Sequence, residues 1–479
     1  MRIAVPRGFG QCRVSGRNLL DTMSTLSRRS FVAGSAALIA APAVAATSDL
    51  ADVPVAIVGA GAAGIAAARR LQAAKVRFVL LEASNAIGGR CVTDTATFGV
   101  PFDRGAHWIH RPSDNPLLRE THSPDIYPAP RGQKLRIPPR AARENELEAY
   151  LAALVRANRA IIDAGRVADR PASLVLPGDL GVWRDSVEFA LGPYAVGRPL
   201  RDVSTADLAR APERGTDAFC RDGYGALLTK LAAGLPVHLS TPAQRLDWGS
   251  ALRVDTPKGP VWARAVIVTV STAALVGGAL SFTPDLPKSY TDAVAALPLG
   301  QFENIALELP GNPFGLEADD VVFERSSGPR TAALLANVGG GPLSVVNVGG
   351  DFAHDLSRSG EDAMTGFAIE WLSTMFGSDA KRYVKRAAAT RWSGDTLIGG
   401  AFSIARPGRA AARRVLMTPL RDRVWFAGEA VHETLWGTVN GAWDSGTRAA
   451  EAAMRFIAGG EKALPKSGKK PKRNRRNRQ

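Results

Sequence analysis

Three glycines near the start of the chain have the spacing that binds a pyrophosphate. Gly59, Gly61 and Gly64 follow a short apolar run and open an alanine-rich stretch. The first glycine permits a tight turn, the second lets the backbone approach a phosphate, and the third lets helix and strand pack closely. A helix that starts with Ala62 and Ala63 adds free N–H groups and the positive end of its dipole. The pattern therefore predicts a dinucleotide site.

An acidic residue and a second glycine pair extend this site. Glu82 lies 23 residues after Gly59, at the end of a second apolar run. Its carboxylate can accept hydrogen bonds from both ribose hydroxyls, and it would repel a 2′-phosphate. Gly88 and Gly89 bring the backbone near the pyrophosphate again, and Arg90 can neutralise it. A glycine turn with a surface arginine is the alternative for this motif. We expect a dinucleotide other than NADP.

In their order along the chain these motifs resemble the FAD-dependent amine oxidases. That family has an acid, a G-G-R triplet and a G-A-x-W-I stretch near its start, and F-A-G-E-A and G-T-V-x-G-A elements near its end. The corresponding residues are 82, 88–90, 105–109, 426–430 and 437–442. The resemblance covers residues 53–457 and implies FAD as the cofactor. It adds as cofactor contacts Gly105, Ala106, His107, Trp108, Ala243, Trp392, Gly428, Glu429, Thr438 and Val439.

The resemblance also implies an activity. In the family, flavin N5 takes a hydride from the carbon next to an amine, the imine is hydrolysed, and dioxygen reoxidises the flavin to give hydrogen peroxide. The expected partners are a small-molecule amine and O2. His110 follows the W-I pair, as in polyamine oxidases, and this favours a polyamine oxidase-like enzyme. His110 either binds the substrate nitrogen or is a structural histidine. Phe402 and Trp436 match family positions that face the flavin.

Four positions depart from the family pattern. Asn304 stands where the family usually has a lysine that holds a water against flavin N5, so a positive charge is missing there. Ala401 stands where some relatives have a cysteine bonded to the flavin, which implies noncovalent FAD. Phe402 replaces a tyrosine, and Ala86 replaces an arginine that often contacts phosphate. We include Asn304 with His110, Phe402 and Trp436 among the candidate catalytic residues.

The expected fold is α/β, with a discontinuous Rossmann-type FAD-binding domain and an α+β substrate domain built on a mixed sheet. We assign residues 47–118, 217–280 and 390–460 to the first and 119–216 and 281–389 to the second. Apolar periodicity predicts helices over 62–74, 144–164, 361–376 and 441–457. It predicts strands over 53–58, 77–81, 245–252, 261–270, 304–309, 321–324, 331–336 and 343–348. Loops are expected near 129–139 and 310–315.

The first 46 residues resemble a twin-arginine (Tat) signal peptide. Arg28 and Arg29 precede an apolar run that Pro42 interrupts and that is too short to span a bilayer. The run ends in a small-x-small pattern at residues 43–45. We expect export by the Tat machinery to the periplasm or beyond in a bacterium, with Met23 as an alternative start. A chance arginine pair before an alanine-rich helix is the competing interpretation.

Charge and cysteine content exclude other classes of protein. The net charge is +15, but residues 1–46 and a tail over 461–479, expected to be disordered, carry most of it. A nucleic-acid-binding face on the folded body is therefore not indicated. No stable membrane span is expected. Cys12, Cys91 and Cys220 allow at most one disulfide in a mature chain and exclude a cysteine-rich metal site.

Two alternatives to an amine oxidase stay open. One keeps the fold and changes the substrate, to an L-amino acid or to a compound that is not an amine. An amino-acid oxidase needs an arginine aimed at the substrate carboxylate, and the sequence places none of its many arginines in a cavity. The other is a protein that binds flavin and a ligand without turnover, which Asn304 in place of the lysine permits.

Overall fold

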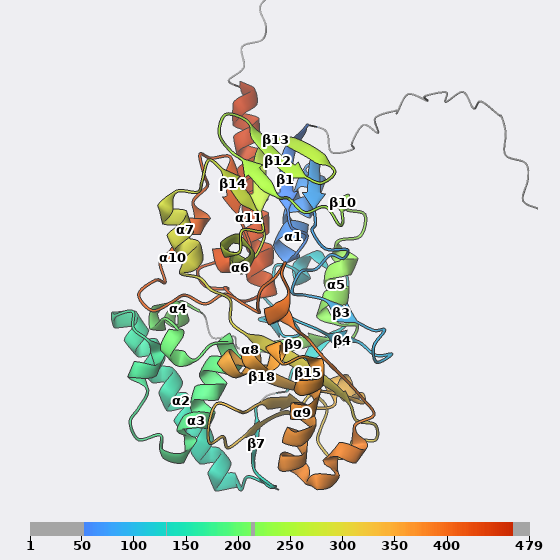
Figure 1. Cartoon of the computed structure of the whole chain (residues 1–479), viewed down its shortest axis with the longest axis vertical. Helices are drawn as coiled ribbons and strands as arrows, with labels where there is room; N and C mark the ends of the chain where they lie inside the picture. The colour runs from blue at the N-terminus through green and yellow to red at the C-terminus, as the bar shows by residue number, and fades with distance from the viewer. Residues whose placement is uncertain (1–51, 131, 212–215, 463–479) are drawn as a thin grey trace, which may run out of the picture. The chain divides into compact units, whose positions relative to one another are not determined.

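The computed structural model describes residues 52–130, 132–211 and 216–462. It contains two large sheets, which Figure 1 shows as separate groups of strands. The predicted signal peptide and most of the basic tail lie outside these residues. No helix in the described ranges is both long and apolar enough to cross a membrane.

The first large sheet has eight strands and carries the glycine motif. Its central strand β1 (Val53–Val58) pairs in parallel with β2 (Phe78–Leu81) on one side and β13 (Gly259–Val268) on the other. Beyond these lie β10 (Val237–His238), β12 (Leu252–Thr256), β11 (Arg245–Asp247) and β14 (Ser281–Thr283), while β20 (Val424–Phe426) also pairs with β13. The predicted strands over 53–58 and 77–81 are confirmed. The sheet places the carboxyl ends of β1, β2 and β20 at one edge.

Side chains of β1 alternate between the two faces of this sheet, as a buried parallel strand requires. Val55 and Ile57 pack with helices α1 (Ala62–Ala73) and α11 (Val439–Lys462). Ala56 and Val58 pack on the opposite face with α7 (Lys288–Ala295) and α10 (Ala412–Met417). Both faces are thus covered, which explains why β1 reads as a continuous apolar run.

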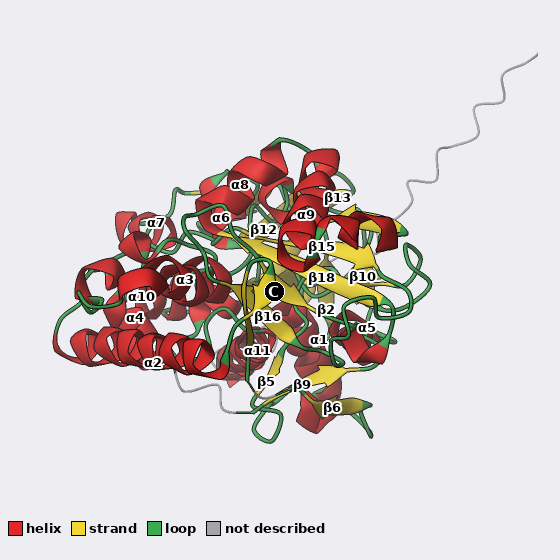
Figure 2. Ribbon diagram, turned by 90° about the horizontal axis from the view of Figure 1, so that it is seen from below, coloured by secondary structure: helices red, strands yellow, loops and turns green. Residues whose placement is uncertain are grey.

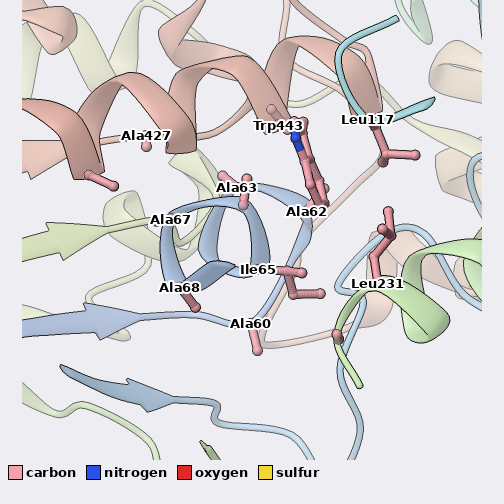
Figure 3. Close-up of a cluster of buried hydrophobic side chains, with 14 of the residues drawn as sticks. Ala60, Ala62, Ala63, Ile65, Ala67, Ala68, Leu117, Leu231, Ala427 and Trp443 are labelled. Atoms are coloured by element: carbon pink, nitrogen blue, oxygen red, sulfur yellow. The ribbon is translucent and has the colours of Figure 1, made fainter. Parts of the chain in front are cut away.

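Helices α1 and α11 lie side by side, and Figure 3 shows Trp443 of α11 above Ala62 and Ala63 of α1. The contact is close because Gly446 has no side chain. A Cβ at that position would lie 2.0 Å from the Ala63 carbonyl oxygen. Segments nearly 400 residues apart in the chain therefore meet on one face of the sheet.

The second large sheet has seven strands in the order β19 (Arg386–Ala389), β15 (Phe302–Glu308), β18 (Leu343–Gly349), β17 (Ala333–Leu335), β16 (Val321–Glu324), β7 (Lys134–Ile137), β8 (Arg140–Ala141). It is mixed, since β16 and β7 are parallel while the other pairs are antiparallel. Its mixed character agrees with the prediction.

Helices cover one face of this sheet, and part of the other face is open to a cavity. Helices α8 (Gly350–Arg358) and α9 (Glu361–Phe376) pack with one face, as seen in Figure 2. Part of the opposite face packs with α2 (Glu144–Val167) and α3 (Arg184–Phe189). The helix predicted over 361–376 is confirmed, and α2 extends the predicted 144–164 by three residues.

Two sequence expectations about the fold need correction. The strand predicted over 245–252 is two strands, β11 and β12, joined by residues 248–251. The two strands pair antiparallel, with Asp247 opposite Arg253, so the chain reverses direction between them. The loop expected at 129–139 contains strand β7, because pairing with β16 overrides its local proline and glycine content. Cys91 and Cys220 are both buried and free, so these two form no disulfide. The domain boundaries remain predictions.

Candidate functional site

A cavity of about 1210 Å³ joins the glycine motifs of the first sheet to the open face of the second. Cofactor-sized ligands occupy clefts of roughly 300–1,000 Å³, so this volume accommodates a ligand and more. It is lined by nearly all the predicted site residues, namely Gly59, Gly61, Ala62, Ala63, Glu82, Gly88, Gly89, Arg90, Gly105, Ala106, His107, Trp108, His110, Ala243, Asn304, Trp392, Phe402, Gly428, Glu429, Thr438 and Val439. We call the part formed by the glycine motifs the dinucleotide end, and the part formed by strands β15 to β18 the sheet end.

The first glycine turn has the geometry that its sequence predicts. Gly59 has a φ of +102°, which side chains disfavour. A Cβ on Gly61 would meet no atom within 4 Å, so the backbone there is open to a ligand. Gly64 does not line the cavity; a Cβ there would lie 1.9 Å from the Gly59 carbonyl oxygen. Its contribution is close packing between helix and turn.

Glu82 holds the turn together and keeps capacity for a ligand. Its Oε2 accepts a hydrogen bond from the Ala60 N–H at 2.7 Å, and its Oε1 accepts one from the Ser84 N–H at 2.8 Å. An ionised carboxylate has about four acceptor positions. Two therefore remain, which is enough for the predicted pair of ribose hydroxyls.

The second glycine pair lies directly against the first turn. Gly88 forms a bridge with Gly61, and its N–H donates to the Ala60 carbonyl at 2.9 Å. Gly88 and Gly89 both have positive φ, +111° and +57°. A single concave backbone surface results from two motifs that the sequence separates by more than twenty residues.

Arg90 and Glu429 link the first and last motifs by an ion pair of 2.9 Å. Arg90 also donates to the carbonyl of Ala401. The Arg90 guanidinium thus has two protein partners, and its contact with a pyrophosphate stays a prediction. Glu429 in addition accepts from the Gly437 N–H at 2.9 Å, which positions the residues just before α11. Glu429 thus connects Arg90 of the second glycine motif with the residues that precede α11.

A buried chain of charges continues from Glu429 away from the cavity. The Ser403 hydroxyl donates to Glu429 at 2.7 Å and accepts from Arg413 at 2.9 Å. Arg413 is fully buried and forms a bidentate pair with Asp207 at 2.8 and 2.7 Å. Burial opposes ionisation of Glu429, but the Arg90 and Arg413 guanidiniums outweigh it and hold its pKa below the usual value. Sequence reasoning missed Asp207, Ser403 and Arg413, since nothing local distinguishes them from surface residues.

Trp392 is held in the lining by its neighbours. Its Nε1 donates to the Arg104 carbonyl at 2.9 Å, and its backbone N–H donates to the Glu303 carboxylate at 2.9 Å. Glu303 is fully buried and also accepts from the Thr390 hydroxyl and from Ser393. This acid, which sequence reasoning missed, fixes the loop that carries Trp392.

Two histidines of the lining are each oriented by an aspartate. His107 Nδ1 lies 2.8 Å from Asp103, and its Nε2 is buried without a partner among the described residues. His110 Nδ1 lies 2.8 Å from Asp217, the residue directly opposite it in a small antiparallel sheet. Asp217 also lines the cavity, and nothing in the sequence connected it to His110.

Asn304 lies in the lining, but its amide already has protein partners. Its Nδ2 donates to the Arg104 carbonyl at 2.9 Å, and its Oδ1 accepts from Asn347 Nδ2 at 2.7 Å. Asn304 and Asn347 face each other across strands β15 and β18. Whether Asn304 also holds a water stays a prediction. Asn347, a second amide in the lining, was missed by sequence reasoning.

Aromatic side chains line the same cavity as this amide pair. Phe402 contacts Phe302 at a centroid distance of 6.0 Å, and Tyr194 contacts both Phe302 and Phe323 at 6.0 and 4.9 Å. All four line the cavity. Of these, only Phe402 was predicted, because the others belong to no motif.

The prediction that Trp436 forms part of the cavity wall is wrong. It does not line the cavity and is only 2% exposed. Its ring lies under the Arg413 guanidinium, 4.9 Å from the ring centroid, and its Nε1 donates to the Asp207 carbonyl. Trp436 therefore packs around the buried Arg413–Asp207 pair, which takes it out of the cavity wall.

Comparison with known proteins supports the family resemblance. Residues 176–454 match the family model of flavin containing amine oxidoreductase, and residues 57–123 match an NAD(P)-binding Rossmann-like domain. The chain is 27% identical to Arabidopsis thaliana polyamine oxidase 2, over 84% of this chain and 88% of that protein. It is 26% identical to human lysine-specific histone demethylase 2, but it spans only 53% of that relative's length.

Solved structures share the fold at low identity. Putrescine oxidase bound to putrescine aligns with a TM-score of 0.72 at 18% identity, over 84% of this chain and 99% of that one. Cyclohexylamine oxidase from Brevibacterium oxydans IH-35A aligns with a TM-score of 0.71 at 18% identity, over 85% and 100%. The fold is therefore a Rossmann-like dinucleotide domain with a mixed-sheet domain.

Proposed function

Because the chain belongs to the flavin containing amine oxidoreductases, we propose that it oxidises the CH–NH group of a small amine and passes the electrons to dioxygen, giving hydrogen peroxide. One observation carries this proposal. A single cavity connects the glycine turns of the dinucleotide end with the apolar, aromatic sheet end. A cofactor and a small substrate can therefore meet in one continuous cavity.

The cofactor is FAD held without a covalent bond, and the residues present fit it. The open space at Gly61 admits a pyrophosphate, and the first turns of α1 and α11 both line the cavity through Ala62, Ala63, Thr438 and Val439. Helix N-termini favour negative groups. Ala401 has no thiol for a covalent link. When bound, FAD supplies the two-electron acceptor for the substrate carbon.

The chain's own residues orient the substrate and exclude water. Trp392 and Phe402 both line the cavity, Phe402 contacts Phe302 of the sheet end, and aromatic faces orient amines. The apolar sheet end keeps bulk water away from the reacting carbon. His110, whose Nδ1 lies 2.8 Å from Asp217, is proposed to hydrogen-bond the substrate nitrogen. Positioning of this kind is the usual protein contribution to flavin chemistry.

The arginines of the cavity argue against an amino-acid substrate. Among the described residues, Arg90, Arg104 and Arg391 line it. Arg90 is paired with Glu429, and Arg104 lies 3.5 Å from Asp94. Arg391 is exposed. None of these three is a buried, unpaired guanidinium that could bind the carboxylate of a substrate. A simple amine is therefore favoured over an L-amino acid.

Anaerobic mixing of the purified holoenzyme with amines tests the proposal. Primary alkylamines, arylalkylamines, polyamines and L-amino acids would be compared by bleaching of the flavin absorbance and by peroxide release in air. We expect bleaching and peroxide with at least one amine. A spectral shift without bleaching for every compound would instead indicate a flavoprotein that binds ligands without turnover.

We also propose that the chain is exported by the Tat route to the periplasm or beyond. The arginine pair and the apolar run before residue 46 support this. Replacement of Arg28 and Arg29 together by lysine should retain the protein in the cytoplasm of a bacterial host, as measured by cell fractionation. Equal export of both versions would contradict the proposal.

A further inference from the structure

The sheet end of the cavity is built mainly from alternate residues of three strands, and Leu335 of β17 adds to it. Phe302 and Asn304 of β15, Val321 and Phe323 of β16, and Leu343, Val345 and Asn347 of β18 all line it. Their intervening neighbours, such as Val322 and Val346, pack on the far side with α8 and α9. A period of two places one set on one face of a sheet. On this face the two asparagines are the only polar residues among these seven.

Hydrogen-bond polarity fixes how the two amides are oriented. The Arg104 carbonyl can only accept, so Asn304 must turn its NH2 group toward it. The Asn304 oxygen then requires a donor, which is the NH2 group of Asn347. Asn347 Oδ1 is left as an acceptor to which no described residue donates. This series of hydrogen bonds thus ends at Asn347 Oδ1, a carbonyl oxygen to which no described residue donates, on a residue that lines the cavity.

The sheet end of the cavity has few groups that could pair with an ammonium group on a second amine of a substrate. None of the lining residues from β15 to β18 is acidic. Among the other lining carboxylates of the described residues, Glu82 and Glu429 belong to the dinucleotide end. Asp217 binds His110, Asp103 binds His107, and Asp395 accepts from the Leu397 and Ile398 N–H groups. The remaining polar residues there, Gln133, Tyr194 and Thr390, are neutral. A buried ammonium group without a partner is strongly disfavoured.

We propose that the enzyme is specific for monoamines with an apolar body, and that Asn347 Oδ1 is the acceptor that binds the amine N–H. This inference rests on the proposed function and narrows it. The amide oxygen recognises an N–H donor without demanding a full counter-charge. The aromatic and aliphatic wall takes the hydrocarbon part, and a di- or polyamine is rejected because its second ammonium would be buried unpaired.

A matched pair of substrates tests the specificity. Hexylamine and 1,6-diaminohexane have the same carbon chain and differ by one terminal amine. The rate constant of anaerobic flavin reduction divided by the Kd should be on the order of 100-fold higher for hexylamine. Equal or better reduction by the diamine would overturn the substrate class while leaving amine oxidation intact. If neither hexylamine nor phenylethylamine nor any diamine bleaches the flavin, the proposed function fails as well.

Two variants of Asn347 separate recognition from structural support. Asn347→Leu removes the acceptor and should raise the Kd of hexylamine about 10- to 100-fold. Asn347→Asp keeps an acceptor at the same place but cannot donate to Asn304 when ionised. It should therefore retain hexylamine binding within about threefold of the parent, as expected if the acceptor and not the amide pair is what matters. Equal weakening by both variants would overturn the assignment.

Ser344→Ala is the control on the same strand. Ser344 is buried on the face away from the cavity, where its hydroxyl accepts from the Asn337 N–H at 3.0 Å. Its loss removes a hydrogen bond of similar strength without touching the lining. We expect an unchanged Kd for hexylamine; a change as large as that of Asn347→Leu would show that general loosening of β18 explains the effect.

Discussion

The two ends of the cavity are built from different parts of the chain. At the dinucleotide end the lining is largely backbone, formed by the turns at Gly59, Gly61, Gly88 and Gly428. At the sheet end it is largely side chain, formed by alternate residues of β15, β16 and β18. Backbone surfaces depend on conformation and close packing, whereas side-chain surfaces depend on which residue occupies each position. Substitutions should therefore affect the two ends differently.

The largest effect is expected where backbone packing is tightest. Gly64→Ala places a Cβ 1.9 Å from the Gly59 carbonyl oxygen, so helix α1 and its turn must move apart. We expect loss of bound FAD, measured from flavin absorbance of the purified protein. Gly366→Ala in helix α9 is the control, because a Cβ there meets nothing within 4 Å. It should be neutral or stabilise by about 0.5–1 kcal/mol. A fully loaded Gly64→Ala protein would contradict this account.

The next largest effect is expected when the buried ion pair between Arg413 and Asp207, next to the dinucleotide end, is broken. Arg413→Met leaves Asp207 buried without its partner, which should cost about 3–5 kcal/mol of unfolding free energy. The double variant with Asp207→Asn should recover part of that loss. Lys288→Ala at an exposed pair with Asp292 serves as control, with an expected cost below about 1 kcal/mol. Denaturant unfolding measures all three, and equal costs for Arg413→Met and Lys288→Ala would refute the role of the buried pair.

Adjacent residues of β18 test the two faces of the second sheet. Val346 is fully buried under α8 and α9, so Val346→Ala should cost roughly 1–3 kcal/mol. Val345 lines the cavity, so Val345→Ala should cost less and should instead change the KM for an apolar amine. Unfolding free energy and steady-state kinetics distinguish them. The comparison fails if Val345→Ala has the larger cost and leaves the KM unchanged.

The smallest effect is a pH dependence centred on Glu429. Its folded-state pKa is lowered, so its contribution to stability is present above the unfolded pKa, about 4.3. The contribution is lost as the pH falls through the folded value. The stability difference between the parent and Glu429→Gln should therefore shrink on acidification below about pH 4. Thermal unfolding of the holoenzyme between neutral and acid pH measures it, and a difference that grows on acidification would show the wrong sign.

The sequence predicted the dinucleotide end well because its information is local. Gly59 to Gly64 and Gly88 to Arg90 are contiguous, and each glycine has a conformational reason that can be stated without the fold. The same holds for β1 and α9, whose apolar patterns alone gave the observed bounds. Trp436 shows where such local information fails. Its position in a motif suggested that it forms the cavity wall, but in the structure it packs against Arg413 instead.

Which residues form the sheet end could be determined only from the tertiary structure. Asn347 carries no local signal, and its importance arises from pairing with Asn304 across two strands and from an Arg104 carbonyl contributed by a distant loop. Asp217 became relevant to His110 for the same reason. The chain by itself therefore determined the cofactor motif, because turn geometry is encoded by neighbouring residues. The fold determined the sheet end of the cavity, because strand register brings together residues that the sequence keeps apart.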